Sequence, residues 1–401
     1  MMRAARRVGV LLRERFFPLG IPLAWRQLVA EKKRFAAAVA GITFAVTMML
    51  YQMGLESALF DQVVAPLLQM NGDIVLISPQ YEYFGISREF PQTRLTQASS
   101  LPEVFDTAAL LQGTLPFKNP QTGRDRDIFV MAFNPSDYPF TNPDIVNHQA
   151  LLKRDRMVLF DTLSRADYGP IGELFAQKGE VTTEIAGKSA KVVGVFEMGP
   201  TFAADGNLLM GRDAFLALWP SARENQISIG LLQLKPGADP NAVAQKLRTK
   251  LTAGDVDVYT RDEFIQKEKT YWSQRTPIGF VIGASLLVSL IVGAVIVYQI
   301  LYTDVTDHLH EYATLKSIGF TDGFFVKLVL QESLILSILG FVPGTGLAAL
   351  LYWLTQTLGH MPTKLYAINV LGVFGLSLMM CLLAGGLATR KLRQANPADI
   401  F

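Results

Sequence analysis

The chain has 401 residues, of which half are hydrophobic and only 18% are charged, and its mean hydropathy is +0.26. A soluble protein of this length could bury a core with fewer apolar residues, so the composition favours a membrane protein. The net charge of +2 argues against a nucleic-acid partner, the single Cys381 excludes an intramolecular disulfide, and four histidines argue against a structural metal site.

Four apolar segments are long enough to cross a hydrocarbon core of about 30 Å. They are residues 35–55, 277–302, 324–358 and 368–389. The first is too long for the apolar part of a signal peptide, and the basic stretch before it is also too long. We therefore predict an integral membrane α-helical fold of four transmembrane helices in a 1+3 arrangement. A large extracytoplasmic α+β domain, residues 56–276, is inserted between helices 1 and 2.

Lysine and arginine residues beside the spans set the predicted orientation. The loop 359–367 carries only Lys364, whereas the tail 390–401 begins with Arg390, Lys391 and Arg393. The segment 1–34 is strongly basic. Its cations are Arg3, Arg6, Arg7, Arg13, Arg15, Arg26, Lys32, Lys33 and Arg34. Both termini are therefore expected in the cytoplasm, with 56–276 and 359–367 outside and the loop 303–323 inside.

Segment 56–276 consists of strand-like runs separated by turn residues. Strands are predicted within 72–79, 126–135, 155–161, 227–234 and 255–260, and a helix at 241–251. Residues 181–196 predict a hairpin that turns at Gly187, because Thr and Val alternate on both arms. We expect an α+β domain of one or two lobes.

Both connections between this domain and the spans are predicted to be continuous helices. Residues 51–70 keep a helical apolar spacing up to the turn at Asn71–Gly72. Residues 261–275 are polar and favour a helix, with Tyr271 and Trp272 where an interfacial aromatic belt would lie. Two such helices form a stalk, which is either a spacer or a rod that transmits movement.

Within the spans, two pairs of glycines have the GxxxG spacing that allows helices to approach closely: Gly279 with Gly283, and Gly340 with Gly344. They are candidate packing positions, including for a dimer contact. Glu332 is an acidic residue inside an apolar run, about two turns from the cytoplasmic edge. It could reach the interface, pair with Lys327 or bond to a neighbouring helix, and an ion relay is the alternative.

The loop 303–323 predicts a short helix with an exposed apolar ridge, because Leu309, Tyr312 and Leu315 follow at i, i+3 and i+6. Gly319 is placed to end it and Thr321 to begin the next helix. The ridge either packs on the membrane surface or forms a docking surface. His308 and His310 diverge on a helix, so they do not form a metal site.

No nucleophile, acid–base pair or metal-ligand spacing stands out in 56–276, and GxxxxGK[ST] is absent from the chain. We expect no catalytic residue, no cofactor and no metal in this chain, which is not an enzyme in this interpretation. If ATP drives the protein, ATP and Mg²⁺ are bound by a separate ATPase.

The loop, the 1+3 topology and the closing "ATRKLRQANPADIF" resemble the permease subunits of FtsX/MacB-type ABC exporters. Within that group, the chain is most similar to the DevC-like permeases of the DevBCA family. The resemblance extends from "PLAWRQLVAEKKRF" at 22–35 to Phe401. Further stretches that carry it are "GDIVLISPQ", "VMAFNP", "TFAADGNLL", "TPIGF", "AVIVYQ" and "TDVTDHLHEYATLKSIGF".

The resemblance implies that the loop holds a coupling helix seated in a groove of the ATPase. The residues implied in this contact are Leu309, Glu311, Tyr312, Leu315, Lys316, Gly319 and Phe320. Residues 22–34 would lie along the inner leaflet, with Leu23, Trp25, Leu28 and Val29 opposed to Arg26 and 31–34.

The family further implies a homodimer in the bacterial cytoplasmic (inner) membrane, in contact with its lipids. Its partners would be a DevA-like ATPase, a DevB-like membrane-fusion adaptor and a TolC-like outer-membrane protein. Export of glycolipid or another amphiphile is the implied task. The alternatives are an FtsX-like regulator of cell-wall hydrolases, a lipoprotein extractor and, from another class, a membrane receptor with an extracytoplasmic sensory domain.

Overall fold

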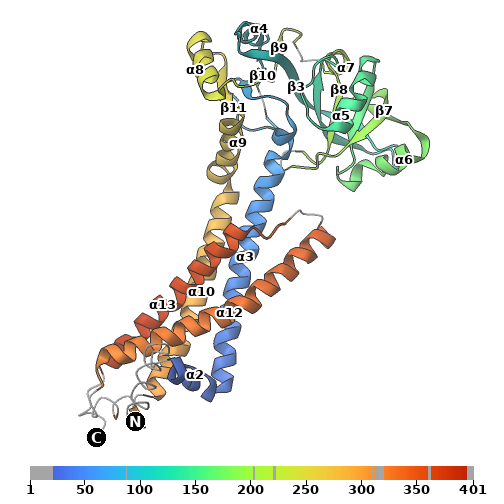
Figure 1. The fold of residues 1–401 in the computed structure, drawn as a ribbon. Coiled ribbons are helices and arrows are strands. Elements are labelled where there is room, and N and C mark those ends of the chain that lie inside the picture. Colours follow the sequence, from blue (N-terminus) through green and yellow to red (C-terminus); the bar gives the residue numbers. More distant parts are fainter. Residues whose placement is uncertain are drawn as a thin grey trace, which may run out of the picture. The chain divides into compact units, whose positions relative to one another are not determined.

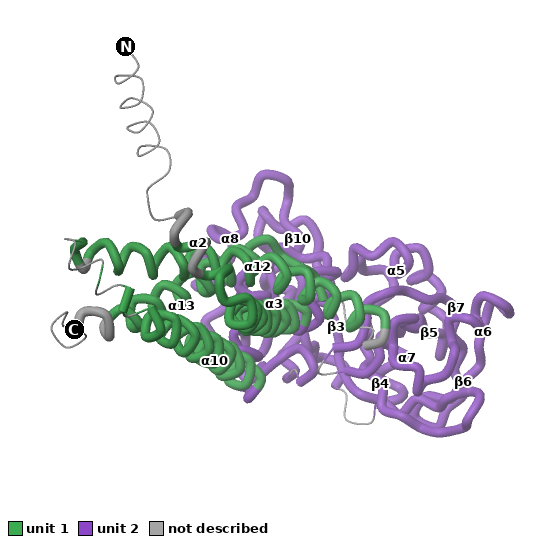
Figure 2. Tube along the Cα trace, turned by 90° about the horizontal axis from the view of Figure 1, so that it is seen from below, with its two compact units in different colours: residues 1–58, 278–401 green, residues 59–277 purple. Residues whose placement is uncertain are grey.

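The computed structural model describes residues 21–86, 88–201, 204–219, 223–308, 310–311, 314, 320–359 and 363–394. Its contacts divide the chain into two compact units, coloured separately in Figure 2. We call residues 1–58 with 278–401 the helical unit, and residues 59–277 the sheet unit. The predicted fold class, four membrane helices with an α+β domain between the first and the second, is confirmed.

The helical unit is built on four long helices that are apolar enough to cross a membrane (Figure 1). They are α3 (Lys32–Gln69), α10 (Pro277–Asp307), α12 (Asp322–Gly359) and α13 (Ala367–Gln394), and the shorter α2 (Ile21–Ala30) precedes them. Helix α3 continues from the span to Gln69 and contains Pro66, so the first predicted continuous connection is confirmed. A core of side chains such as Ile42, Met49 and Val297 joins α3 to α10, α12 and α13.

The sheet unit contains eleven named strands among its described residues. These are β1 (Ile74–Ile77), β2 (Phe90–Pro91), β3 (Val104–Lys118), β4 (Asp125–Phe133), β5 (Met157–Asp161), β6 (Val181–Ile185), β7 (Lys188–Phe196), β8 (Asn207–Gly211), β9 (Gln226–Ile227), β10 (Ile229–Leu234) and β11 (Asp257–Thr260). The accompanying helices are α4 (Thr93–Ser99), α5 (Pro143–His148), α6 (Ile171–Lys178), α7 (Arg212–Leu218), α8 (Pro240–Lys250) and α9 (Arg261–Thr270). Short 3-10 turns occur at Gln149–Lys153 and Ala166–Tyr168.

Nine strands form one sheet in the order β11-β1-β10-β3-β4-β8-β5-β7-β6, and β3 is shared by two lobes. The first part of β3 pairs with β10 from Val104 to Leu110, and the second part pairs with β4 from Leu110 to Lys118. Phe117 also pairs with Ile185 of β6, which closes the second lobe on itself. Each lobe has its own core: α4 and α8 cover the first, and α6 and α7 pack on the second.

The strands predicted at 72–79, 126–135, 155–161, 227–234 and 255–260, and the helix at 241–251, are confirmed. The hairpin of β6 and β7 is also confirmed, with Ala186 and Gly187 as its two-residue turn. Both turn residues have positive φ, +48° and +72°, as a tight hairpin turn of this kind requires. The sequence did not predict β3, because Gly113 and Pro116 interrupt its apolar pattern.

The second connection differs from the predicted continuous helix. Helix α9 ends at Thr270, and residues Tyr271–Arg275 form a π-helical turn. Thr276 is then extended, with φ −113° and ψ 155°, before α10 begins at Pro277. The helix breaks there because the ring of a proline disfavours the α conformation for the residue before it.

Candidate functional site

The loop between α10 and α12 is described only in part. His310, Glu311 and Thr314 are helical and exposed. Phe320 is 43% exposed, and its ring centroid lies 4.8 Å from that of Phe324 at the start of α12. Of the predicted contact residues, Glu311 and Phe320 thus face solvent. Leu309, Tyr312, Leu315, Lys316 and Gly319 lie outside the described residues.

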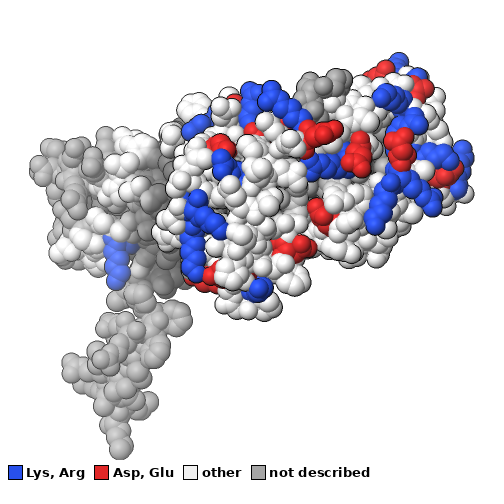
Figure 3. Space-filling view, turned by 90° about the horizontal axis from the view of Figure 1, so that it is seen from above, with Lys and Arg blue, Asp and Glu red and all other residues white. Residues whose placement is uncertain are grey.

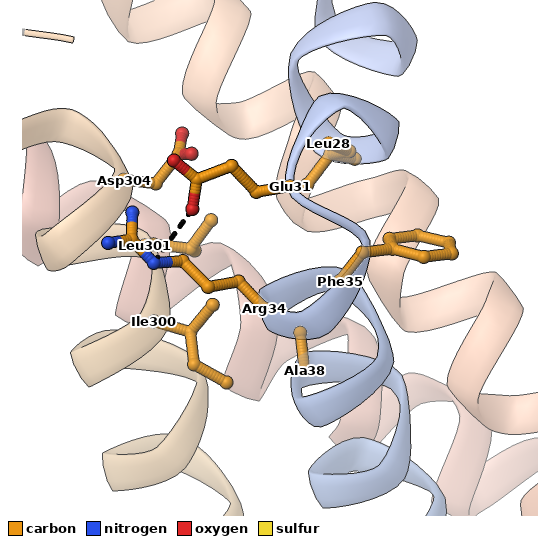
Figure 4. Close-up of a pocket in the computed structure, with 8 residues that line it drawn as sticks. All are labelled: Leu28, Glu31, Arg34, Phe35, Ala38, Ile300, Leu301 and Asp304. Carbon is orange, nitrogen blue, oxygen red and sulfur yellow. Dashed lines mark ion pairs between the residues drawn. The ribbon is translucent and has the colours of Figure 1, made fainter. Parts of the chain in front are cut away.

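The helix that enters this loop is held at its end by a charged group on α3. Arg34 forms ion pairs with Glu31, at 2.8 Å, and with Asp307 in the last turn of α10. Figure 4 shows the Arg34 side chain extending from α3 towards α10, beside Asp304. These groups border a small cavity lined by Leu28, Glu31, Arg34, Phe35, Ala38, Ile300, Leu301 and Asp304. We call Glu31, Arg34, Asp304 and Asp307 the charged clamp.

Asp304 is the buried member of the charged clamp, at 7% exposure. Its Oδ1 lies 3.6 Å from Nδ1 of His308, one turn on, and its Oδ2 has no hydrogen-bond partner among the described residues. A buried carboxylate needs a nearby cation or hydrogen-bond donors to offset its lost hydration. Arg34 and His308 are the basic groups that act on it. Movement of the loop would therefore change the distances from the buried Asp304 carboxylate to Arg34 and His308.

Glu332 of α12 is fully buried, and neither carboxyl oxygen has a hydrogen-bond partner among the described residues. The three predicted structural roles are wrong among the described residues: the buried side chain does not reach the interface, the exposed Lys327 forms no ion pair with it, and it makes no hydrogen bond to a neighbouring helix. Glu332 instead interacts electrostatically with the carboxyl group of Asp304 on α10. The sequence did not link Arg34 to Asp307 or Asp304 to Glu332, because a separation this long leaves no signal in one sequence.

The predicted glycine pairs have different surroundings. A side chain on Gly340 would collide with Ile42 of α3, and one on Gly344 with Val46. At the same places the hydroxyls of Thr43 and Thr47 donate to the carbonyls of Gly340 and Gly344, at 3.2 and 3.1 Å. These two glycines hold α12 close to α3 within one chain.

The other glycine pair lies on α10. A side chain on Gly283 would meet nothing within 4 Å. Neighbouring α10 side chains such as Phe280 and Leu287 are exposed, at 77% and 56%. This face of α10 has no partner among the described residues and is available to lipid or to another chain.

In the sheet unit, the described residues contain no cluster of three or more His, Cys, Asp or Glu that could hold a metal ion. Basic and acidic side chains are interspersed on the face drawn in Figure 3. Ion pairs within the sheet unit include Arg126 with Asp205 at 2.5 Å and Lys191 with Glu180 at 2.8 Å. No large surface of one sign appears on that face.

Comparison with known proteins places the two units in one family. Residues 35–250, more than half of the chain, match the model of the MacB-like periplasmic core domain. Residues 283–397 match the FtsX-like permease C-terminal domain. The chain belongs to the FtsX/MacB family of permeases. Its sheet unit is the periplasmic core domain of that family, and α10, α12 and α13 form the FtsX-like part.

Among similar proteins is the macrolide export ATP-binding/permease protein MacB of Psychrobacter arcticus, 20% identical over 392 residues. MacB of Escherichia coli K12 is 21% identical over 415 residues. The alignments cover 92% and 96% of this chain but only 57% and 60% of those proteins. The chain therefore spans less than two thirds of the length of the MacB proteins it matches.

Two solved structures are also similar. The periplasmic region of MacB from Actinobacillus actinomycetemcomitans is 9% identical, with a TM-score of 0.33, and the match covers 49% of this chain and 92% of that one. The extracellular domain of the transporter YknZ from Gram-positive bacteria is 15% identical, with a TM-score of 0.31, over 47% of this chain and all of the other.

Proposed function

We propose that this permease is the membrane subunit of an ATP-driven exporter of the mechanotransmission type. A separate ATPase would dock on the loop 303–323. The observation that carries this proposal is that the helices on both sides of the loop, α10 and α12, lie within the FtsX-like match at 283–397. The exposed Glu311 and Phe320 at the described edges of the loop support it.

In this mechanism, closure of two ATPase subunits pulls on the loop, and the pull reaches α10 first at the charged clamp. Asp307 and Asp304 lie in the last turn of α10 and interact with Arg34 of α3. Because α3 is one continuous helix from Lys32 to Gln69, with Pro66 in its last turn, a displacement at its first turn would be carried along the helix to its other end. Both termini would be cytoplasmic in the bacterial inner membrane.

The proposed assembly contains a second copy of the permease, a DevA-like ATPase, a DevB-like adaptor and a TolC-like outer-membrane protein. The exposed face of α10 around Gly283 could contact lipid or the second copy. The substrate would be a glycolipid or another amphiphile. Since the similar MacB proteins carry macrolide export in their names, a macrolide is a practical first compound for transport assays.

A pull-down with the candidate ATPase tests the docking loop. In Tyr312→Asp/Leu315→Asp, two carboxylates would replace apolar groups in an apolar groove, which should abolish a micromolar contact. Thr314→Asp is the matched control. It adds one carboxylate to the same loop at an exposed position that does not belong to the predicted ridge of Leu309, Tyr312 and Leu315. We expect the double variant to lose the ATPase and Thr314→Asp to retain it, with both proteins folded by size-exclusion chromatography.

Other results of the pull-down would favour one of the alternative functions. If the double variant keeps the ATPase, the docking assignment is wrong. If the unmodified permease binds no ATPase, the receptor interpretation takes its place. If the ATPase binds but a coiled-coil hydrolase activator is captured in place of an adaptor, the permease is an FtsX-like regulator. A lipoprotein extractor would instead carry lipidated protein on its periplasmic domain.

A further inference from the structure

A fully buried carboxyl lies in the sheet unit beside the π-helical turn. Glu268, on α9, has zero exposure. The Tyr81 hydroxyl donates a hydrogen bond to its Oε1, and Oε2 has no hydrogen-bond partner among the described residues. Glu268 belongs neither to the charged clamp nor to the loop 303–323.

The carboxyl joins α9 to the segment between β1 and β2, which we call loop 78–86. Tyr81 is 5% exposed, and its ring lies 5.4 Å from that of Phe264 on α9. Tyr83 stacks on Tyr271 at 5.0 Å and meets Trp272 edge-on at 5.3 Å. Loop 78–86 therefore contacts both α9 and the π-helical turn, and Glu268 is the ionisable carboxyl buried in that contact.

The other charged or titratable groups around the contact give Glu268 no full ion pair. Lys267, its neighbour on α9, is directed to Tyr259, with Nζ 5.0 Å from the ring centroid and 3.3 Å from the hydroxyl. The remaining titratable groups around Glu268 are tyrosines and one exposed carboxylate: Tyr81, Tyr83 and Glu82 from the loop, and Tyr271 from the π-helical turn. A charge on Glu268 is thus stabilised by donors but is not neutralised.

We propose that Glu268 is a proton-operated latch between loop 78–86 and the α9–π-turn segment. The latch is closed when the carboxyl carries its proton, because a neutral acid can stay buried beside the aromatic rings. When the proton leaves, a fully buried carboxylate without a neutralising ion pair remains in the contact, and opening to water relieves that cost. The π-helical turn Tyr271–Arg275 is the segment that yields, since it is a rare single-turn departure from the α-helix of the kind that is frequent at functional sites.

The acid–base properties of the site agree with this latch and fix its direction. Burial raises the pKa of Glu268 to about 7 from the ordinary 4.5, although Tyr81, the Phe84 backbone, Trp272 and Lys267 each act to lower it. A raised folded-state pKa means that the closed form binds the proton more tightly than the open form. The closed contact is therefore most stable below about pH 4.5, weakens as the pH rises towards about 7, and changes little above that.

The first test follows the emission of Trp272 against pH in the full-length permease in lipid nanodiscs. Subtracting the signal of Trp272→Phe removes the contribution of the other three tryptophans. We expect a sigmoidal change with a midpoint between about 4.5, the ordinary pKa of the open form, and about 7, the pKa of the closed form. Glu268→Gln, which cannot ionise, should show no transition and keep the acid-form spectrum. The matched control Glu82→Gln removes an exposed carboxylate from the same loop and should titrate like the unmodified protein.

Two further results keep the latch falsifiable if Glu268→Gln does not fold. Tyr81→Phe removes a hydrogen bond that favours the ionised form, so its midpoint should rise by about half to one pH unit. Spin labels at Glu82→Cys and Gln274→Cys, in a Cys381→Ser background, should give a narrow distance distribution at about pH 5 and a broader one at about pH 9. An unchanged Tyr81→Phe midpoint, or equal distributions at both values, would overturn the latch.

Discussion

Asp161 illustrates how one buried side chain fixes a local fold. Its carboxylate is fully buried and accepts hydrogen bonds from the backbone N–H groups of Leu163, Met198 and Gly199, at 3.1, 3.0 and 2.8 Å. The amide of Asn207 donates a fourth, at 2.8 Å. Asp161 ends β5, so this side chain ties the end of β5 to the segment after β7 and to β8.

Replacing Asp161 by Ala should destabilise the sheet unit by about 3 kcal/mol, because four donors lose their acceptor, and the bonds from Met198 and Asn207 are fully buried. Asp155→Ala is the matched control. Asp155 is 67% exposed and pairs with its chain neighbour Arg156, so the change should stay within about 0.5 kcal/mol. Pulse proteolysis of the full-length protein in urea measures both. Equal effects of the two substitutions would contradict this role for Asp161.

Single residues were the least predictable level of the structure. The sequence identified Glu332 as an acidic residue in an apolar run, and the structure shows that this residue is buried. Its electrostatic interaction with Asp304 was not predicted. Asp161 and Glu268 drew no attention at all. Glu268 lies in a polar helix and Asp161 is the last residue of a strand, and at neither place does one sequence distinguish a buried carboxyl from an exposed one.

At the scale of elements, α12 and α3 are held together by contacts that only glycine allows. Gly344 lies against Val46, whereas Gly346, two residues on in the same helix, has nothing within 4 Å of where a side chain would begin. Small residues let helix backbones approach closely and pack by van der Waals contact and interhelical hydrogen bonds. The Thr47 bond to the Gly344 carbonyl is one such contact.

Gly344→Leu should therefore separate the two helices and cost about 2–4 kcal/mol, while Gly346→Leu should be tolerated. The loss of folded, monodisperse protein on heating in detergent measures the difference. If Gly346→Leu is as damaging as Gly344→Leu, then overpacking between α3 and α12 is not the cause. Damage from Gly346→Leu alone would point to a contact with another chain.

Elements were the level at which sequence reasoning worked best. The apolar spans, the hairpin at Gly187 and most strands have clear local signatures, and the structure confirms them. The failures have identifiable causes. Strand β3 was missed because Gly113 and Pro116 interrupt its apolar pattern, and the reason for Gly113 is a packing contact with the Trp219 ring that the sequence does not reveal. The break before α10 was missed because the effect of Pro277 on Thr276 was overlooked.

At the scale of the whole molecule, each unit has hydrophobic cores of its own. The core around Ile42 and Val297 belongs to the helical unit, whereas those around Phe133, Phe160 and Leu247 belong to the sheet unit. A segment with its own cores and a continuous nine-stranded sheet should fold without the rest of the chain.

We therefore expect residues 59–277 to fold as a soluble protein when expressed alone. Its far-ultraviolet circular dichroism should show mixed helix and strand, and urea should unfold it cooperatively. Carrying Asp161→Ala into this fragment should lower its urea midpoint, while Asp155→Ala should not. A fragment that is insoluble or unfolds without a transition would mean that the sheet unit depends on the membrane helices.

Because strand β3 is shared by both lobes, one lobe cannot be replaced by that of a related permease without cutting this strand. Its first half completes the sheet of one lobe and its second half completes the other, through a single run from Val104 to Lys118. A crossover within that run would leave each lobe with an unpaired strand edge, which invites aggregation. We therefore expect a chimaera of two such permeases to fold only when both lobes come from the same parent.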